Sequence, residues 1–514
     1  MEYISYDEII EATGGEIIVK GESAFDKSEV ALYNNVSIDT RAIKANDIFI
    51  AIRGENFNAN DFAVQASKKG ASICIVDEMK FESIEFSKNT SVIKVADTKK
   101  ALRDLAKFYI NKLNLKVVGI TGSTGKTSTK DLVAAVLSSK FKVFKTLGNF
   151  NNEIGLPLMI FKLDKSYDIA VLEMGMSDFG EIHNLCEVAR PDIAIITNIG
   201  MSHLENLKTR ENILKAKMEI TDYFRSDNVL IVNSDNDLLE HISNLNYKII
   251  KTGIDSEADF KACNLNVEEN KITFSLMDQG KLIRNSFVVN IPGRHNILNS
   301  SLAVACGRTL GMSYDEITEG FKNLEATSMR LDIVKGEKFT VINDCYNASP
   351  DSMLAAIDVL CDVHGKSKIA ILGTMRELGS GAFEAHKQVG EYAKRKNIDL
   401  LITLGEFNEA YKKGFNDINK YKSFENYKEV VSFLEGIIDE DAIVLVKASR
   451  YMKFEEIVSE LMNINSSMNI NSSMNINSSM NINSSMNINS LGNINHLEEK
   501  TPIKKTDVKE VIER

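Results

Sequence analysis

An apolar stretch at residues 117–120 is followed, after Thr121, by the sequence Gly-Ser-Thr-Gly-Lys-Thr at residues 122–127. A glycine loop between a buried strand and a helix can turn several backbone N–H groups toward one anion. Lys126 would then reach the outer phosphates of a nucleotide, and the Thr127 hydroxyl could bind Mg²⁺. This segment therefore predicts a nucleoside triphosphate site formed by Gly122, Ser123, Thr124, Gly125, Lys126 and Thr127.

The spacing of this loop departs from the strict P-loop pattern at one position. Ile120 stands where that pattern requires glycine. GTPases and motor ATPases, which follow the strict pattern, are therefore disfavoured. The alternative to a nucleotide site is an ordinary strand-turn-helix unit with a chance Gly-Lys-Thr.

The composition restricts the class of protein. A chain of 514 residues suggests about three domains, and a net charge of -11 with a pI near 5.4 argues against a nucleic-acid surface. The N-terminus has no basic and apolar leader, and no apolar run approaches the ~18 residues that span a bilayer, so we expect a cytoplasmic protein without membrane insertion. The six cysteines form no Cys-x-x-Cys pair, which makes a disulfide framework or a zinc site improbable.

Short strands and helices alternate along most of the chain, and we divide it into an N-terminal region (1–111), a central region (112–326) and a third region (327–461). Apolar strands separated by helices predict open parallel sheets, whose ligands gather at the carboxyl ends of the strands. The expected strands are 47–52 and 71–76 in the N-terminal region; 117–120, 168–173, 192–197 and 228–233, followed by antiparallel strands 272–276 and 286–290, in the central region; and 340–343, 368–372, 400–403 and 442–446 in the third region.

Residues 462–514 form a tail of different composition. Copies of Met-Asn-Ile-Asn-Ser-Ser repeat every six residues from Met462 to Ser485 and then decay. Such a tract offers too little apolar surface to offset the entropy of ordering the chain. We expect disorder, with a short β-solenoid or a helix at 497–514 as alternatives.

Three further side chains suit chemistry at a phosphate site. Glu173 ends one predicted strand, His203 follows another, and Lys217 lies in a helical stretch. A carboxylate at a strand end can hold Mg²⁺ against a triphosphate. Taken singly, His203 is more often a structural histidine and Lys217 a solvated residue on a helix face, so their joint occurrence carries the argument.

Taken together, these segments resemble the Mur ligase family along residues 36–458. The matching segments are 37–41, 47–54, 122–127, 148–157, 173–175, 198–205, 215–217, 293–299, 329–331, 344–353, 372–379 and 446–450. The resemblance implies a three-domain α/β architecture: a small N-terminal α/β domain, a central parallel-sheet P-loop ATPase domain and a C-terminal Rossmann-like α/β domain, followed by a disordered tail. It also implies an ATP-dependent ligase that adds D-alanyl-D-alanine to UDP-N-acetylmuramoyl-tripeptide through an acyl phosphate, acts with Mg²⁺ and is a monomer.

The resemblance also assigns roles to individual residues. It implies catalytic roles for Lys126, His203, Lys217 and Arg330. It implies ATP contacts by the loop and by Asn296, Arg330 and Asp344, and metal contacts by Thr127, Glu173, His203 and a Lys217 carbamylated by CO₂. The expected substrate contacts are Asp39, Thr40, Arg41, Asn149, Asn152, Tyr346, Asn347, Lys447, Ser449 and Arg450.

Two groups of alternatives remain open at this point. Within the ligases, the chain could add a diamino acid or act like a folylpolyglutamate synthase, but it lacks the Asp-Asn-Pro motif of the diamino-acid enzymes. The sequences at 346–350 and 375–379 favour the dipeptide-adding enzymes. Outside the ligases, the chain could be an ATP-binding scaffold that makes no bond. Because Arg330 and Lys126 lie in different regions, a ligase would have to close the third region over the central one.

Overall fold

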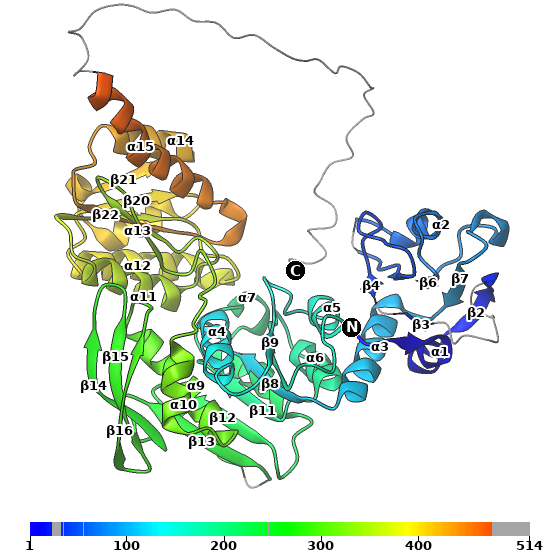
Figure 1. The fold of residues 1–514 in the computed structure, drawn as a ribbon. Helices are drawn as coiled ribbons and strands as arrows, with labels where there is room; N and C mark the ends of the chain where they lie inside the picture. The colour runs from blue at the N-terminus through cyan, green and yellow to red at the C-terminus, as the bar shows by residue number, and fades with distance from the viewer. Residues whose placement is uncertain (23–31, 34, 55, 245, 475–514) are drawn as a thin grey trace, which may run out of the picture.

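The computed structural model describes residues 1–22, 32–33, 35–54, 56–244 and 246–474. Within these ranges the chain forms three successive α/β units, each with its own main sheet (Figure 1). The predicted three-part α/β architecture is therefore confirmed. None of the described helices combines the length and apolar composition needed to cross a membrane.

The central region contains a nine-stranded sheet in the order β16-β15-β14-β13-β12-β11-β8-β10-β9. Its strands are β8 (Lys116–Thr121), β9 (Val143–Lys145), β10 (Ile169–Glu173), β11 (Ile193–Ile196), β12 (Val229–Asn233), β13 (Lys248–Gly253), β14 (Phe260–Val267), β15 (Ile272–Asp278) and β16 (Lys281–Val289). Pairing is parallel from β9 to β14 and antiparallel from β14 to β16. Every strand predicted for this region is present.

Helices cover both faces of the central sheet, so neighbouring residues of β8 are both buried. Val117 packs with α5 and α6 on one face, and Val118 packs with α4 and α9 on the other. This explains why the parallel strands are apolar throughout instead of alternating with polar residues. The helices of the central region are α4 (Lys126–Leu137), α5 (Gly155–Ile160), α6 (Glu181–Ala189), α7 (Leu204–Leu207), α8 (Arg210–Met218), η4 (Glu219–Thr221), α9 (His295–Thr309) and α10 (Tyr314–Phe321).

The strand order places three functional segments at one sheet edge. β8 lies between β10 and β11, with Ile120 beside Glu173 and Thr121 beside Ile196. Because these strands are parallel, the glycine loop, Glu173 and the segment after β11 all emerge at their carboxyl ends. Ligands of open parallel sheets bind at this position.

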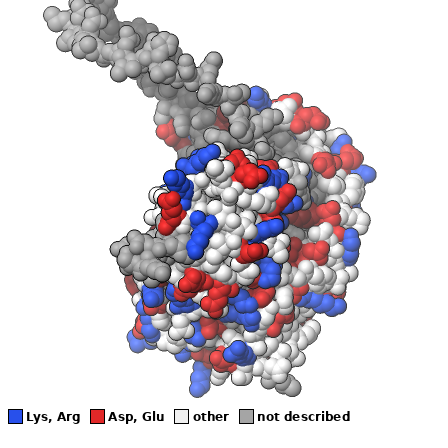
Figure 2. All heavy atoms as spheres, turned by 90° about the vertical axis from the view of Figure 1, so that its right-hand side faces the viewer, with Lys and Arg blue, Asp and Glu red and all other residues white. Residues whose placement is uncertain are grey.

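The N-terminal region has a five-stranded sheet, β2-β7-β6-β5-β4, and a small β1-β3 pair. Its elements are β1 (Ile4–Ser5), α1 (Tyr6–Thr13), β2 (Glu16–Val19), β3 (Leu32–Tyr33), β4 (Val36–Ser37), β5 (Ile48–Ile50), η2 (Ala59–Phe62), α2 (Ala63–Lys68), β6 (Ile73–Val76), η3 (Ser83–Glu85), β7 (Ser91–Lys94) and α3 (Thr98–Leu113). Helix α3 joins this region to the central one, where the buried Tyr109 hydroxyl donates to Leu163 O at 2.6 Å. Figure 2 views the molecule from the right-hand side of Figure 1 and shows acidic and basic side chains interspersed on that face.

The third region has a six-stranded sheet, β17-β18-β22-β19-β20-β21, in which only β17 is antiparallel to its neighbour. Its strands are β17 (Asp332–Lys335), β18 (Thr340–Asn343), β19 (Ser367–Leu372), β20 (Leu400–Leu404), β21 (Tyr421–Phe424) and β22 (Ala442–Lys447). Its helices are α11 (Pro350–Asp362), η5 (Gly379–Gly381), α12 (Ala382–Arg395), α13 (Asn408–Phe415), η6 (Ile418–Lys420), α14 (Tyr427–Glu435), η7 (Arg450–Met452) and α15 (Glu455–Met474). The predicted strands of this region are all present.

Helix α15 corrects the predicted start of the tail. It continues through Met462, where disorder was expected to begin, to Met474. The reason is burial of two residues of the first repeat copy, Ile464 and Asn465, against the third region. The Asn465 amide oxygen accepts from Lys338 N at 3.0 Å, and its Nδ2 donates to Phe339 O at 3.0 Å. The remaining part of the tail, 475–514, lies outside the described residues.

We predict that Asn465→Ala lowers the free energy of unfolding by about 1–3 kcal/mol, because it leaves buried backbone groups without hydrogen bonds. Urea unfolding measures this change. Ser459→Ala in the same helix is the control, since Ser459 is exposed and its loss should cost less than half as much. Equal effects of the two changes would contradict the anchoring role of Asn465.

Candidate active site

The glycine loop is shaped by close contact with the end of β11. A Cβ atom on Gly122 would lie 1.8 Å from Thr197 Oγ1, so only glycine fits there. Gly125 has φ +75°, a left-handed conformation, and directly precedes α4. Asn198 Oδ1 accepts from Thr124 N at 2.8 Å, and the Thr197 hydroxyl donates to Thr124 O at 2.5 Å. The loop is therefore held in place by two side chains that sequence reasoning had not assigned.

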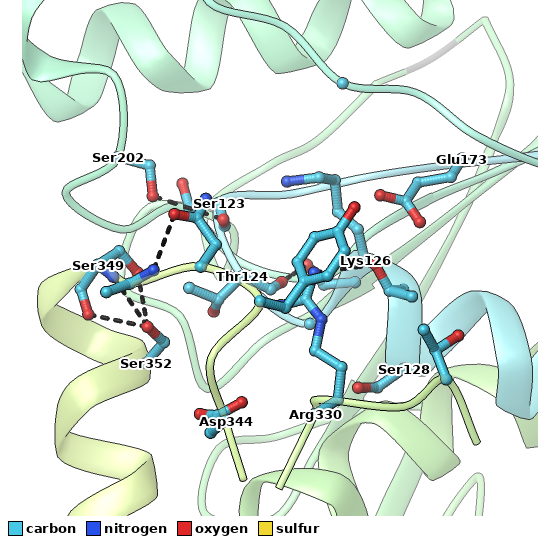
Figure 3. A pocket seen from close by; sticks show the side chains of 18 of the residues that line it. Ser123, Thr124, Lys126, Ser128, Glu173, Ser202, Arg330, Asp344, Ser349 and Ser352 are labelled. Carbon is cyan, nitrogen blue, oxygen red and sulfur yellow. Dashed lines mark hydrogen bonds between the residues drawn. The ribbon is translucent and has the colours of Figure 1, made fainter. Parts of the chain in front are cut away.

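Lys126 is the cation at the centre of this edge. Its Nζ donates to Gly122 O at 2.8 Å across the loop. Burial lowers the pKa of Lys126, and the charge of Glu173 opposes that change. Figure 3 shows Lys126, Glu173 and Arg330 around a shared space.

Glu173 supplies a buried carboxylate at the end of β10. Its Oε1 accepts from Asn151 Nδ2 at 2.9 Å. Its Oε2 is buried and has no hydrogen-bond partner among the described residues. A buried carboxylate oxygen without a partner is costly, so this atom suits a cation.

His203 contacts the third region. Its Nδ1 lies 2.5 Å from Glu377 Oε2. Burial lowers the pKa of His203, whereas contact with His203 lowers the pKa of Glu377. Both directions favour a neutral imidazole in close contact with an ionised carboxylate.

Lys217 is almost completely buried on α8, with 1% of its surface exposed. The alternative that it lies on a solvated helix face is therefore wrong. No described carboxylate lies within ion-pair distance of its amine, and burial, followed by the charge of Lys126, holds its pKa well below the usual value. A neutral, nucleophilic amine is favoured at this position. Lys217 is not among the residues that line the cleft surface described below.

Arg330 brings the third region to the glycine loop. Its Nη2 donates to Thr127 Oγ1 at 3.3 Å, and its guanidinium stacks on the Tyr346 ring at 4.0 Å. The structure thus brings Arg330 and Lys126 into one site, although 203 residues separate Arg330 from Thr127. The stacking fixes the direction of the guanidinium.

Asp344 and Lys447 form a buried ion pair in the cleft wall. Lys447 Nζ donates to Asp344 Oδ2 at 2.6 Å and to Asn347 O at 2.8 Å. Burial lowers the pKa of Lys447, and Asp344 opposes that change. The amine of Lys447 is thus already bonded within the third region, where it fixes the backbone beside Tyr346.

The other predicted third-region and ATP residues also line the cleft. Asn296 Nδ2 donates to Pro292 O at 2.7 Å, and Ser449 Oγ accepts from Arg376 N at 3.1 Å. Arg450 Nη1 lies 2.8 Å from Glu455 Oε1. Asn149 and Asn152 face the same cleft, but Asn151 between them contacts Glu173.

Asp39, Thr40 and Arg41 lie apart from these residues, in the N-terminal region. The Arg41 guanidinium is 2.8 Å from Asp39 Oδ2 and, through hydrogen bonding, lowers the pKa of that carboxyl. Thr40 O accepts from Lys69 Nζ at 2.9 Å. None of the three lines the cleft between the central and third regions.

This cleft has a volume of about 1340 Å³ and is lined by residues of both regions. Its floor is an interregion contact in which Asp351 Oδ2 accepts from Met201 N at 3.3 Å. Glu205 N also donates to Glu377 O at 3.0 Å. Within the described ranges, no three His, Cys, Asp or Glu side chains gather closely enough to hold a metal ion alone.

Five site residues were missed by sequence reasoning: Asn151, Thr197, Asn198, Asp351 and Glu377. All but Thr197, which directly precedes segment 198–205, lie inside segments that the resemblance had already included. Asp351 occupies the first turn of α11, and Glu377 has φ +66°, a conformation that only the fold reveals. The sequence identified the segments but gave no signal for which side chain in each points inward.

Comparison with known proteins decides the family. Three family models match: Mur ligase family, catalytic domain, at 32–110; Mur ligase middle domain at 120–307; and Mur ligase, glutamate ligase domain, at 329–450. The UDP-N-acetylmuramoyl-tripeptide--D-alanyl-D-alanine ligase of Bacillus subtilis is 38% identical over 87% of this chain and 96% of its own length. The chain belongs to the Mur ligase family.

Solved structures of Mur ligases have the same fold. MurF from Acinetobacter baumannii aligns with a TM-score of 0.81 and 27% identity, over 90% of this chain and 99% of that one. MurF ligase from Thermotoga maritima, solved in complex with ADP, aligns with a TM-score of 0.76 and 27% identity over 84% and 98%. The predicted resemblance to the Mur ligases is confirmed.

We predict that Gly200→Ala weakens the contact between the central and third regions of this Mur ligase. The added Cβ would lie 1.9 Å from Asp351 Oδ2, and overpacking of this kind costs about 1–3 kcal/mol. Small-angle scattering should show a larger radius of gyration. Gly381→Ala is the control, because a Cβ there meets nothing within 4 Å. Identical scattering by Gly200→Ala and the unchanged protein would contradict this account.

Proposed function

We infer that this Mur ligase joins D-alanyl-D-alanine to UDP-N-acetylmuramoyl-tripeptide, converting ATP to ADP and forming the UDP-muramoyl-pentapeptide precursor of peptidoglycan. The B. subtilis relative, which carries this activity in its name, matches nearly the whole chain before the tail. The observation that carries the mechanism is the meeting of Lys126 and Arg330 at one cleft. A scaffold that only bound ATP would not need this pairing across two regions.

The reaction requires two anions to approach each other. The tripeptide carboxylate attacks the γ-phosphorus of ATP, ADP leaves, and an acyl phosphate forms. The amine of D-alanyl-D-alanine then attacks the acyl carbon, loses a proton, and phosphate leaves as the amide forms. We propose that Lys126, Arg330 and the N–H groups of residues 122–127 hold the phosphoryl oxygens, because such transfer depends on positioning and charge stabilisation.

We propose that the nucleotide extends from this loop along the start of α9. Asn296 is the proposed adenine contact, because it lines the cleft at this point and its amide is held in place by bonds to Pro292 O and Asn299 Nδ2. Asp344 contacts the ribose or supports the region interface, and its ion pair with Lys447 fixes its position. Closure of the third region would exclude water that could hydrolyse the acyl phosphate.

The residues beside the loop fit Mg²⁺. Glu173 Oε2 is buried without a hydrogen-bond partner, and the Thr127 hydroxyl offers a second oxygen. Hard oxygen donors, completed by phosphate oxygens, suit this ion. We propose Thr127, Glu173 and His203 as its protein contacts, with Glu377 orienting the imidazole. The bound ion would neutralise charge on the phosphates.

We propose that Lys217 carries a carbamate formed from CO₂. A buried amine with a strongly lowered pKa is nucleophilic toward CO₂, and its addition would release a proton and place an anionic carbamate beside Lys126. The carbamate would offer Mg²⁺ the oxygen ligands that a neutral amine lacks.

We propose that the substrates enter from opposite sides. Asp39, Thr40 and Arg41 would contact the UDP sugar in the N-terminal region, while Asn149 and Asn152 face the tripeptide end. Tyr346, Asn347, Ser449 and Arg450 would face the dipeptide or the phosphates, with Lys447 supporting them from behind. In this proposal the enzyme acts as a cytoplasmic monomer, and residues 1–111, 112–326 and 327–461 are its UDP-binding, ATP-binding and ligase domains.

We predict that Lys217→Ala lowers ligation about 100- to 1,000-fold, the usual loss when one preorganised charge contact is removed. Short carboxylic acids added to this variant should restore part of the activity by supplying the missing oxygens. With ¹³C-bicarbonate, a carbamate carbon resonance should appear in the unchanged enzyme and not in Lys217→Ala. Full activity of the variant, or a resonance that persists in it, would exclude Lys217 from this role.

The test of the function is a phosphate-release assay with separated products. Release should require ATP, UDP-N-acetylmuramoyl-tripeptide and D-alanyl-D-alanine together, and mass spectrometry should find the pentapeptide. Tripeptides ending in meso-diaminopimelate and in lysine should both be offered. Phosphate release with ATP alone, or product formation from a UDP-dipeptide and a free diamino acid, would refute the proposed function.

A further inference from the structure

The loop that follows β19, residues 373–378, presents two charged side chains to the cleft. Glu377 turns to His203 in the central region, and its positive φ separates its direction from that of Arg376. The loop backbone is held from behind, because Arg376 N donates to Ser449 Oγ at 3.1 Å and Met375 N donates to His386 Nε2 at 2.8 Å. Arg376 is therefore carried on a fixed backbone.

The guanidinium of Arg376 is positioned but has no acceptor. It stacks on the Tyr451 ring at 3.7 Å, which limits its rotation. Within the described residues, no carboxylate or carbonyl accepts a hydrogen bond from it. A planar guanidinium with an open edge matches the two oxygens of a carboxylate.

The other cations of the cleft are nearly all engaged. Lys126 bonds within the phosphate loop, Arg330 contacts Thr127, and Lys447 pairs with Asp344. Arg450 pairs with Glu455. Lys453 is the one remaining cation in the cleft lining of the described chain. Both Lys453 and Arg376 are exposed, but Lys453 lacks an aromatic contact like the one that orients Arg376.

We propose that Arg376 binds the terminal carboxylate of the incoming dipeptide and so selects a substrate with a free carboxyl end. This inference rests on the proposed function. D-Alanyl-D-alanine must direct its amine to the acyl phosphate at Lys126, so its carboxylate points away from the phosphates. Arg376 lies on the third-region side of Glu377, with Tyr451 of η7 behind it. A dipeptide oriented in this way lies with its amine toward the central region.

The experiment compares D-alanyl-D-alanine with its C-terminal amide, D-alanyl-D-alaninamide, in the full-length enzyme. The unchanged enzyme should prefer the acid by about 10- to 100-fold in kcat/KM, the range for a hydrogen-bonded charged group. Arg376→Met should reduce this preference to less than about 3-fold by raising the KM for the acid. The KM values for ATP and for the UDP-tripeptide should stay unchanged. Arg376→Lys keeps the positive charge but lacks the planar pair of N–H donors, so it should keep part of the preference that Arg376→Met loses.

Two control variants keep the test specific. Arg395 stacks on Tyr392 outside the cleft, so Arg395→Met removes the same kind of pair and should leave the preference intact. The inference is overturned if Arg376→Met keeps the acid preference, loses acid and amide activity equally, or raises the KM for the UDP-tripeptide instead. It is also overturned if only Lys453→Met abolishes the preference. An unchanged enzyme that ligates neither dipeptide would refute the proposed function as well.

Discussion

The parallel pairing of β8 with β10 and β11 determines where the chemistry of this protein occurs. Three chain segments that are distant in sequence end at the same sheet edge. The strand pairing alone therefore brings the glycine loop, Glu173 and Asn198 together. Because the strands are buried on both faces, none of these segments can shift without disturbing the core. The third region then needs to supply only what this edge lacks, which is a second cation at the phosphates and a surface for the attacking amine.

Much of the fold followed from pattern alone. The strands predicted for the central and third sheets are short apolar runs between helices, and each of these appears where the pattern indicates. The pattern did not predict the remaining strands of these sheets, which are β9, β13, β14, β17 and β21. The helical end of the third region could not be predicted from the pattern, because a repeat rich in Asn and Ser is typical of disordered chain. This copy is ordered because Asn465 bonds to three backbone groups beside the β17–β18 turn, which lie 126 or more positions away in the sequence. Composition cannot reveal such a contact.

The site was predictable to the level of segments. Loop residues such as Lys126 have their role fixed by local geometry, so the sequence is sufficient for them. The states of Lys217 and Lys447 depend on burial and on partners contributed by other elements, which the sequence does not display. Likewise, Asn151 contacts Glu173 because the turn before α5 directs Asn152 to the helix backbone, where its Oδ1 accepts from Gly155 N at 2.8 Å.

The first repeat copy holds α15 in place through Asn465, and this affects which changes in repeat number the gene can tolerate. Tandem copies of a short unit are gained and lost when DNA polymerase slips, and here the copies after the first have the same letters in the same order. Removal of any single six-residue unit between Met462 and Ser485 therefore leaves the same Met-Asn-Ile-Asn-Ser-Ser sequence directly after Leu461. Changes in repeat number can accumulate in the gene while an asparagine remains in place to hold α15 against the β17–β18 turn.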